Sequence, residues 1–133
     1  MNSFYVYLVF LAVTLRIATS HDQPAITYIS PKQIKEVRDT VSLSCVADNV
    51  VDIPVLWTKV AEDTIYISSG SALLVSDNRY SVTTHRNATS SEFTLTISHL
   101  QLEDAGLYKC VLSTGPNNRP SADMELNVRH PSQ

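Results

Sequence analysis

Two cysteines and one tryptophan, spaced around a seven-residue motif, limit what this chain can fold into more than any other feature. The motif runs from Asp104 to Cys110 and reads D-x-G-x-Y-x-C. Upstream stand Cys45 and, twelve positions later, Trp57, the only tryptophan of the chain. Aspartate can hydrogen-bond its own backbone and glycine accepts a positive φ, so the motif predicts a turn that leads into a strand.

Elsewhere the chain alternates between apolar and polar residues in short stretches, which predicts β-strands, and no helical period is visible. Residues 40–46 and 91–97 alternate with period two, as strands with one buried face do. Pro31 interrupts the first strand, which is typical of an edge strand that passes from one sheet to another. The residues predicted to form the core are Leu43, Leu95, Ile97, Trp57 and Tyr108.

This frame resembles that of an immunoglobulin domain. The resemblance implies an all-β, immunoglobulin-like sandwich of two antiparallel sheets with about nine strands. The spacing between Cys45 and Cys110 leaves room for the extra strands of the variable type. A disulfide between these cysteines would join the sheets, Trp57 would pack against it, and the Tyr108 hydroxyl would bond back to the chain.

Arg79 and Asp104 resemble the ion pair that closes one end of variable-type domains. The alternative is that they are two unrelated surface charges.

The N-terminal residues predict a secretory signal peptide at 1–20. The apolar run of residues 4–15 is too short to span a bilayer, and small residues follow it at Ala18 and Ser20. We expect a flexible N-terminus at 21–25, the domain at 26–129, and a tail or linker at 130–133. The predicted product is secreted, or at the cell surface if a longer form carries a membrane anchor. The chain is then a full product, a short isoform or a fragment of a longer receptor.

No pattern of catalytic or cofactor-binding residues stands out. The formal net charge of −3 argues against nucleic acid as a partner. The four histidines, at 21, 85, 99 and 130, have no metal-ligand spacing, and the three glycines form no phosphate-binding loop. We therefore expect no enzyme activity, no cofactor, no metal and no small-molecule substrate.

One sheet face is the better candidate for function. Alternation about Trp57 and Cys110 turns a set of side chains outward, and apolar patches ringed by polar residues are typical of protein contacts. The alternatives are that edge segments cover these residues or that they are scattered apolar side chains. The predicted partner-binding residues are Leu56, Thr58, Val60, Ile65, Ile67, Lys109, Val111 and Ser113. Of these, Ile65 and Ile67 share one face of their own strand, and the sequence leaves open which face that is.

The only glycosylation sequon is Asn87-Ala88-Thr89, in a polar turn predicted to lie on the opposite side of the sandwich. The alternative is that the sequon is unused.

Several stretches resemble the first domain of the lachesin family of insect adhesion proteins, which is related to amalgam and the vertebrate IgLON proteins. These stretches are Thr-Val-Ser-Leu-Ser-Cys at 40–45, Ser-Asp-Asn-Arg-Tyr-Ser-Val at 76–82 and Glu-Asp-Ala-Gly-Leu-Tyr-Lys-Cys at 103–110. The resemblance implies adhesion in neuronal or epithelial contacts, with another immunoglobulin domain, or a second copy of the chain, as the partner. A soluble immune-type receptor or a secreted decoy domain is the alternative function.

Overall fold

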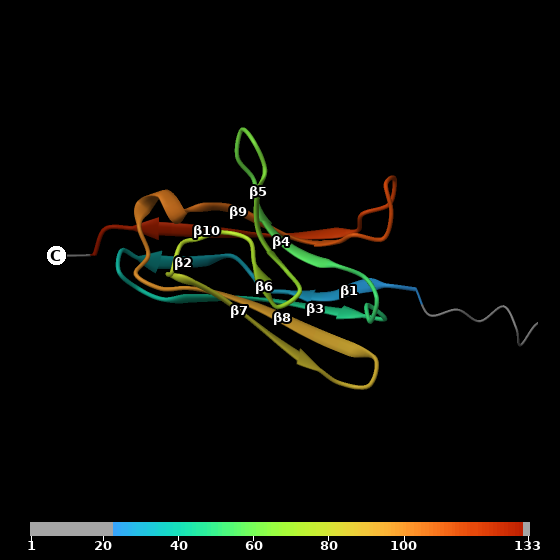
Figure 1. The fold of residues 1–133 in the computed structure, drawn as a ribbon. Helices are drawn as coiled ribbons and strands as arrows, with labels where there is room; N and C mark the ends of the chain where they lie inside the picture. The colour runs from blue at the N-terminus through green and yellow to red at the C-terminus, as the bar shows by residue number, and fades with distance from the viewer. Residues whose placement is uncertain (1–22, 132–133) are drawn as a thin grey trace, which may run out of the picture.

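The computed structural model describes residues 23–131, and these form two β-sheets packed face to face (Figure 1). The predicted leader at 1–20 lies outside the described residues. The four-stranded sheet has the strand order β1 (Ala25–Ile29), β3 (Val41–Asp48), β8 (Ser90–Ile97) and β7 (Tyr80–Arg86). The six-stranded sheet has the order β2 (Gln33–Glu36), β10 (Ser121–Arg129), β9 (Gly106–Leu112), β4 (Val55–Lys59), β5 (Ile65–Ser69) and β6 (Ala72–Leu73).

The N-terminal edge strand changes sheet at Pro31, as the sequence predicts. Before the proline, β1 pairs with β3, and after it β2 pairs with β10. This division gives ten strands in the described part, where about nine were expected. The sheets are antiparallel except that β2 runs parallel to β10.

The core lies between the sheets and is built from the inward residues of each strand. In β3 and β8 every second residue is buried, which matches the period-two pattern of the sequence. The disulfide Cys45–Cys110 is confirmed and joins β3 to β9 across the core. The Trp57 side chain is buried, and its indole Nε1 donates a hydrogen bond to the Phe93 carbonyl at 3.3 Å. Leu43, Leu95, Ile97 and Tyr108 are also fully buried.

At one end of the sandwich, the predicted ion pair forms. The Arg79 guanidinium donates to both carboxylate oxygens of Asp104, at 2.7 and 3.0 Å, a two-pronged geometry that suits this pair. Asp104 lies in the 3-10 turn η1 (Leu102–Asp104), and its carboxylate also accepts a hydrogen bond from the Gln101 amide at 2.8 Å. Its carbonyl accepts the Tyr108 hydroxyl at 2.5 Å. Asp104 thus connects the turn to Arg79, which directly precedes β7, and to Tyr108 of β9.

These contacts change how Asp104 titrates. Burial alone would raise the pKa of Asp104, but the hydrogen bonds from Arg79 and from the Gln101 amide lower it overall. The two carboxylates beside Arg79 raise the pKa of its guanidinium. The pair is therefore charged throughout the physiological pH range.

Two loops rise above the outer side of the six-stranded sheet (Figure 1). One joins β4 to β5, and the other joins β9 to β10. In Figure 1 the strand β1 begins at the right-hand end of the sandwich and β10 ends at the left-hand end, so the two ends of the domain are far apart. Within residues 23–131, no helix is long and apolar enough to cross a membrane.

Candidate partner-binding face

The outer face of the six-stranded sheet carries rows of side chains that point away from the core. Pairing between strands places Leu56 of β4 opposite Val111 of β9, and Val111 opposite Ser121 of β10. The neighbours of the first two in sequence, Trp57 and Cys110, are fully buried. Since successive side chains of a strand alternate between faces, the row Leu56–Val111–Ser121 faces outward.

A second row lies beside the first. It joins Tyr66 of β5 to Thr58 of β4, then to Lys109 of β9 and Asp123 of β10. The Lys109 ammonium lies 3.8 Å from the Asp123 carboxylate, so this lysine is paired within its own chain. Opposite charges at directly facing positions stabilise a sheet modestly.

Between the rows the face is hollowed. The hollow is open and has a volume of about 210 Å³. Its apolar part is formed by Leu56, Val111 and the ring of Tyr66, which is 50% exposed. The residues that line the hollow are Leu56, Thr58, Thr64, Tyr66, Lys109, Val111, Arg119 and Ser121. A half-exposed tyrosine beside aliphatic side chains is the kind of group that anchors protein interfaces.

Four of the eight residues predicted to bind a partner line this hollow: Leu56, Thr58, Lys109 and Val111. Thr58 is only 3% exposed, so it lies at the bottom of the hollow. Three others, Val60, Ile65 and Ser113, are accessible but do not line it. Their part in a partner contact stays a prediction.

The assignment of Ile67 to the binding surface is wrong. Its side chain is 1% exposed and packs in the core. The outward position in this part of β5 belongs to Tyr66, which the sequence analysis did not select. The sequence Ile65-Tyr66-Ile67 is compatible with either orientation, and only the pairing of β5 with β4 decides between them.

The local pairing of β4 and β5 also explains why simple alternation fails here. The register shifts between Trp57 and Thr58, so that Trp57 faces Ser68 while Thr58 faces Tyr66. Such an irregularity bends a strand and re-aims its side chains. As a result, two consecutive residues of β5, Ile67 and Ser68, are both buried, which strict alternation would not allow.

Two other lining residues could not be found from strand alternation, and a third was overlooked. Thr64 and Arg119 lie in the two raised loops, and no periodicity applies to loops. Ser121 begins β10, whose sequence alternates cleanly between polar and apolar residues, so alternation could have placed it on the outer face, but the sequence analysis did not use this signal. For Tyr66 the signal is incomplete. Alternation places Tyr66 on the face opposite to that of Ile67, but the sequence does not say which of the two faces is the outer one.

Lys59, at the end of β4, belongs to the fold rather than to the open face. Its ammonium donates to the Glu103 carbonyl at 2.6 Å and lies 5.5 Å from the centre of the Tyr108 ring. Burial lowers the pKa of Lys59, and the carboxylates of Asp104 and Glu103 partly offset this. Gly106 makes room for the lysine, since an added Cβ would lie 3.0 Å from Lys59 Cε and its φ is +149°.

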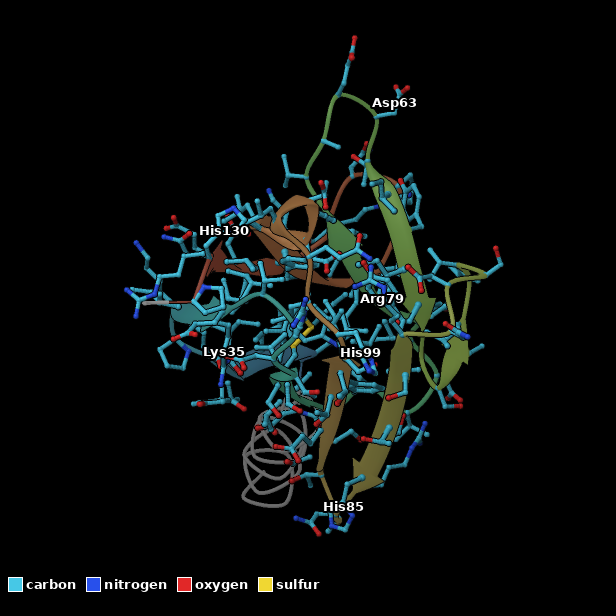
Figure 2. The ribbon with its side chains drawn as sticks, turned by 90° about the vertical axis from the view of Figure 1, so that its left-hand side faces the viewer. Lys35, Asp63, Arg79, His85, His99 and His130 are labelled. Atoms are coloured by element: carbon cyan, nitrogen blue, oxygen red, sulfur yellow. A yellow bond between two sulfur atoms is a disulfide. The ribbon has the colours of Figure 1, made fainter. Side chains whose placement is uncertain are left out.

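A metal site among residues 23–131 would need several histidine, cysteine or acidic side chains close together. No group of three histidine, cysteine or acidic side chains is placed to hold a metal ion there. His85, His99 and His130 lie at separate places in Figure 2. His21 is outside the described residues.

The sequon residue Asn87 is exposed, in the turn between β7 and β8. Both strands belong to the four-stranded sheet, so the turn is on the other sheet from the hollow. The backbone amide of Asn87 donates to the Ser90 carbonyl at 2.8 Å, which closes the turn.

Comparison with known proteins gives a family and three relatives. The family model for the immunoglobulin V-set domain matches residues 30–129. Lachesin of Schistocerca americana is 41% identical over 112 residues, which is 81% of this chain and 32% of that protein. Lachesin of Drosophila melanogaster is 33% identical over 121 residues, 91% of this chain and 33% of that protein. Protein amalgam of Drosophila melanogaster is 26% identical over 114 residues, 81% of this chain and 34% of that protein.

The chain thus spans about a third of the length of these relatives. Among solved structures, the crystal structure of the RIG-5 IG1 homodimer matches with a TM-score of 0.72 at 21% identity, covering 80% of this chain and 98% of that chain. The predicted variable-type sandwich is confirmed by the family match and by this likeness. The family match and the lachesin relatives also support the prediction that the chain is not an enzyme.

Proposed function

Because this chain belongs to the immunoglobulin V-set family and is similar to lachesin, we propose that it is an extracellular adhesion or recognition module. It binds another immunoglobulin domain through the outer face of its six-stranded sheet. The first partner to consider is a second copy of the same chain. RIG-5 IG1, whose fold is similar, is a homodimer in its crystal structure.

The observation that carries the proposal is that Leu56, Tyr66 and Val111 form an apolar cluster within a hollow whose other lining residues are polar. The outer face of the other sheet has a different character. There, Ser42 hydrogen-bonds Thr96 at 3.1 Å and Ser44 hydrogen-bonds Thr94 at 3.1 Å across β3 and β8. The hydroxyls of this ladder are hydrogen-bonded to each other within the sheet. The apolar side chains of the hollow, in contrast, gain free energy when a partner covers them.

Sedimentation velocity over a range of concentrations tests the proposal, with the chain produced in an oxidising host beside a Val111→Arg variant. The substitution places a charge at the centre of the face and leaves the core unchanged. We expect the parent chain to form dimers at rising concentration, and the variant to need a concentration at least about tenfold higher, as burying an unpaired charge costs several kcal/mol.

The matched control is Thr83→Arg, which adds the same charge at an exposed position of β7 on the other sheet. This control should dimerise as the parent does. If both variants lost the dimer equally, the added net charge, and not its position on the six-stranded sheet, would be the cause of the loss. A parent chain that stays monomeric at every concentration would contradict self-pairing, and a different immunoglobulin domain would then be the partner to seek.

A further inference from the structure

The charged groups around the hollow are unevenly distributed. Two lysines of the face are already paired within the chain, Lys109 with Asp123 and Lys32 with Glu125. Arg119, on the β9–β10 loop, forms no salt bridge with any residue between 23 and 131. Its Nε donates only to the Gly115 carbonyl, at 3.4 Å. One uncompensated positive charge therefore stands at this side of the hollow.

The opposite side carries negative charge. The β4–β5 loop has Glu62 and Asp63 at its tip, and both are exposed. Neither forms a salt bridge within the described part of the chain. Figure 2 shows Asp63 at the far end of this loop, which stands clear of the body of the domain. The acidic tip, Glu62–Asp63, and the basic loop that carries Arg119 both rise on the outer side of the six-stranded sheet (Figure 1).

The two loops border the same hollow from different sides. Thr64, next to the acidic tip, and Arg119 both line it, and the Leu56–Val111 row lies between them. In Figure 1 the loops are well separated along the strand direction. A partner seated on the hollow would therefore meet an acidic loop at one side and a basic loop at the other.

Symmetry restricts how a second copy can be seated. When two identical faces meet, the two-fold axis lies in the plane between them. If the axis runs along the line from loop to loop, each loop meets its own copy, and like charges face each other. If the axis runs across that line, each acidic tip meets the Arg119 loop of the other copy. Like-charge contact is unfavourable, so electrostatics selects the second arrangement.

We propose that two copies of this chain pair with their faces turned end for end, so that Glu62 and Asp63 of each lie against Arg119 of the other. The inference rests on the proposed self-pairing and adds its orientation and its charge contacts. Each dimer then has two equivalent contacts between these loops. Because they lie at the rim, they govern specificity and orientation more than total affinity.

The test uses two charge-reversal variants, Arg119→Glu and the double variant Glu62→Lys with Asp63→Lys. In either variant alone, both loop contacts become repulsive. We expect each to dimerise about tenfold more weakly than the parent at low salt. Added salt should weaken the parent dimer and strengthen those of the variants, since it screens attraction and repulsion alike.

Mixing the two variants is the decisive step. In a mixed pair, both contacts again join opposite charges, so the mixed dimer should form with about the affinity of the parent. Labelling one variant with a fluorophore and following it by sedimentation measures this directly. Arg119→Glu mixed with the parent chain is the control, because that pair keeps one attractive and one repulsive contact and should bind with intermediate strength.

The outcomes separate this inference from the proposed function. Variants that dimerise like the parent, while Val111→Arg does not, would overturn the orientation and leave the binding face standing. Weak pairing of each variant with no recovery on mixing would also overturn it. A parent chain that never dimerises would overturn the self-pairing and this inference together. The positions of the charge-reversal variants, Glu62, Asp63 and Arg119, are exposed, and Val111 is partly exposed. Unchanged thermal unfolding of each variant confirms that folding is not the cause.

Discussion

Asp104 shows how much one buried carboxylate contributes to this fold. Its side chain is 7% exposed, and it accepts hydrogen bonds from Arg79 and from the Gln101 amide. When one partner of such a pair is removed, the other is left with its desolvation cost and no compensation. The stability of the domain should therefore depend on the charge of Asp104.

We predict that Asp104→Asn lowers the free energy of unfolding by about 2 kcal/mol at pH 7, because the amide cannot match both donors of Arg79. The pKa of Asp104 is lowered in the folded state, so its contribution is present above the ordinary aspartate pKa of about 4 and is lost as pH falls below it. Urea unfolding at several pH values measures this, and the gap between parent and variant should narrow below about pH 4.

Asp77→Asn is the matched control, since Asp77 also pairs with Arg79 but is more exposed. It should cause a much smaller loss. A loss as large as that of Asp104→Asn, or a gap that does not change with pH, would contradict the role given to Asp104.

Single residues were predictable from the sequence where a motif fixed their role. The D-x-G-x-Y-x-C pattern led to Cys110, Tyr108 and Asp104, and the structure shows the contacts that these residues make. Ile67 was misplaced because nothing in its own neighbourhood distinguishes an inward isoleucine from an outward one. Tyr66 was missed for the same reason.

Among the elements, β3 and β9 are held together by the disulfide. The bond joins residues that are 65 positions apart in the sequence and lie in different sheets. A crosslink of that span restricts the unfolded chain strongly, and chain-entropy estimates give about 4 kcal/mol.

We predict that replacing both Cys45 and Cys110 by alanine lowers the free energy of unfolding by about 4 kcal/mol, with a further loss from the space left beside Trp57. Denaturant unfolding of the variant beside the parent measures this. Reduction of the parent by a thiol should reproduce most of the effect without creating a cavity. Equal stability of reduced and oxidised parent would contradict the prediction.

Strands with a clean alternating pattern were predictable, and strands with an irregular pairing were not. In β3 and β8 each buried residue is two positions from the next, so the sequence identifies the inner face. β5 has no such pattern, and its orientation depends on the register shift against β4. The register of a strand pair depends on contacts with the neighbouring strand, so it cannot be determined from the sequence of one strand alone.

At the scale of the whole molecule, the two outer faces have different chemistry. The six-stranded sheet has the hollow with its apolar cluster of Leu56, Tyr66 and Val111, while the four-stranded sheet has the hydroxyl ladder and the sequon at Asn87. A glycan at Asn87 would be compatible with pairing through the six-stranded sheet.

We predict that the chain secreted from eukaryotic cells carries one N-linked glycan, at Asn87. Enzymatic removal of the glycan, or the substitution Asn87→Gln, should lower the mass in a mass spectrum by that of the glycan. Neither treatment should change self-association, because Asn87 and the hollow are on different sheets. A change in dimer affinity after glycan removal would contradict this separation of the faces.

The distant ends of the domain have a mechanical consequence. A pull on both ends would draw β2 and β10 in opposite directions along their length, because these strands run parallel and sit near opposite ends of the chain. All hydrogen bonds of that ladder would then resist together, in shear, instead of opening one after another. The bond between Cys45 and Cys110 would keep the segment between them from lengthening even after the ladder gave way. In the proposed adhesion role, such a domain would resist extension when it is pulled from both ends.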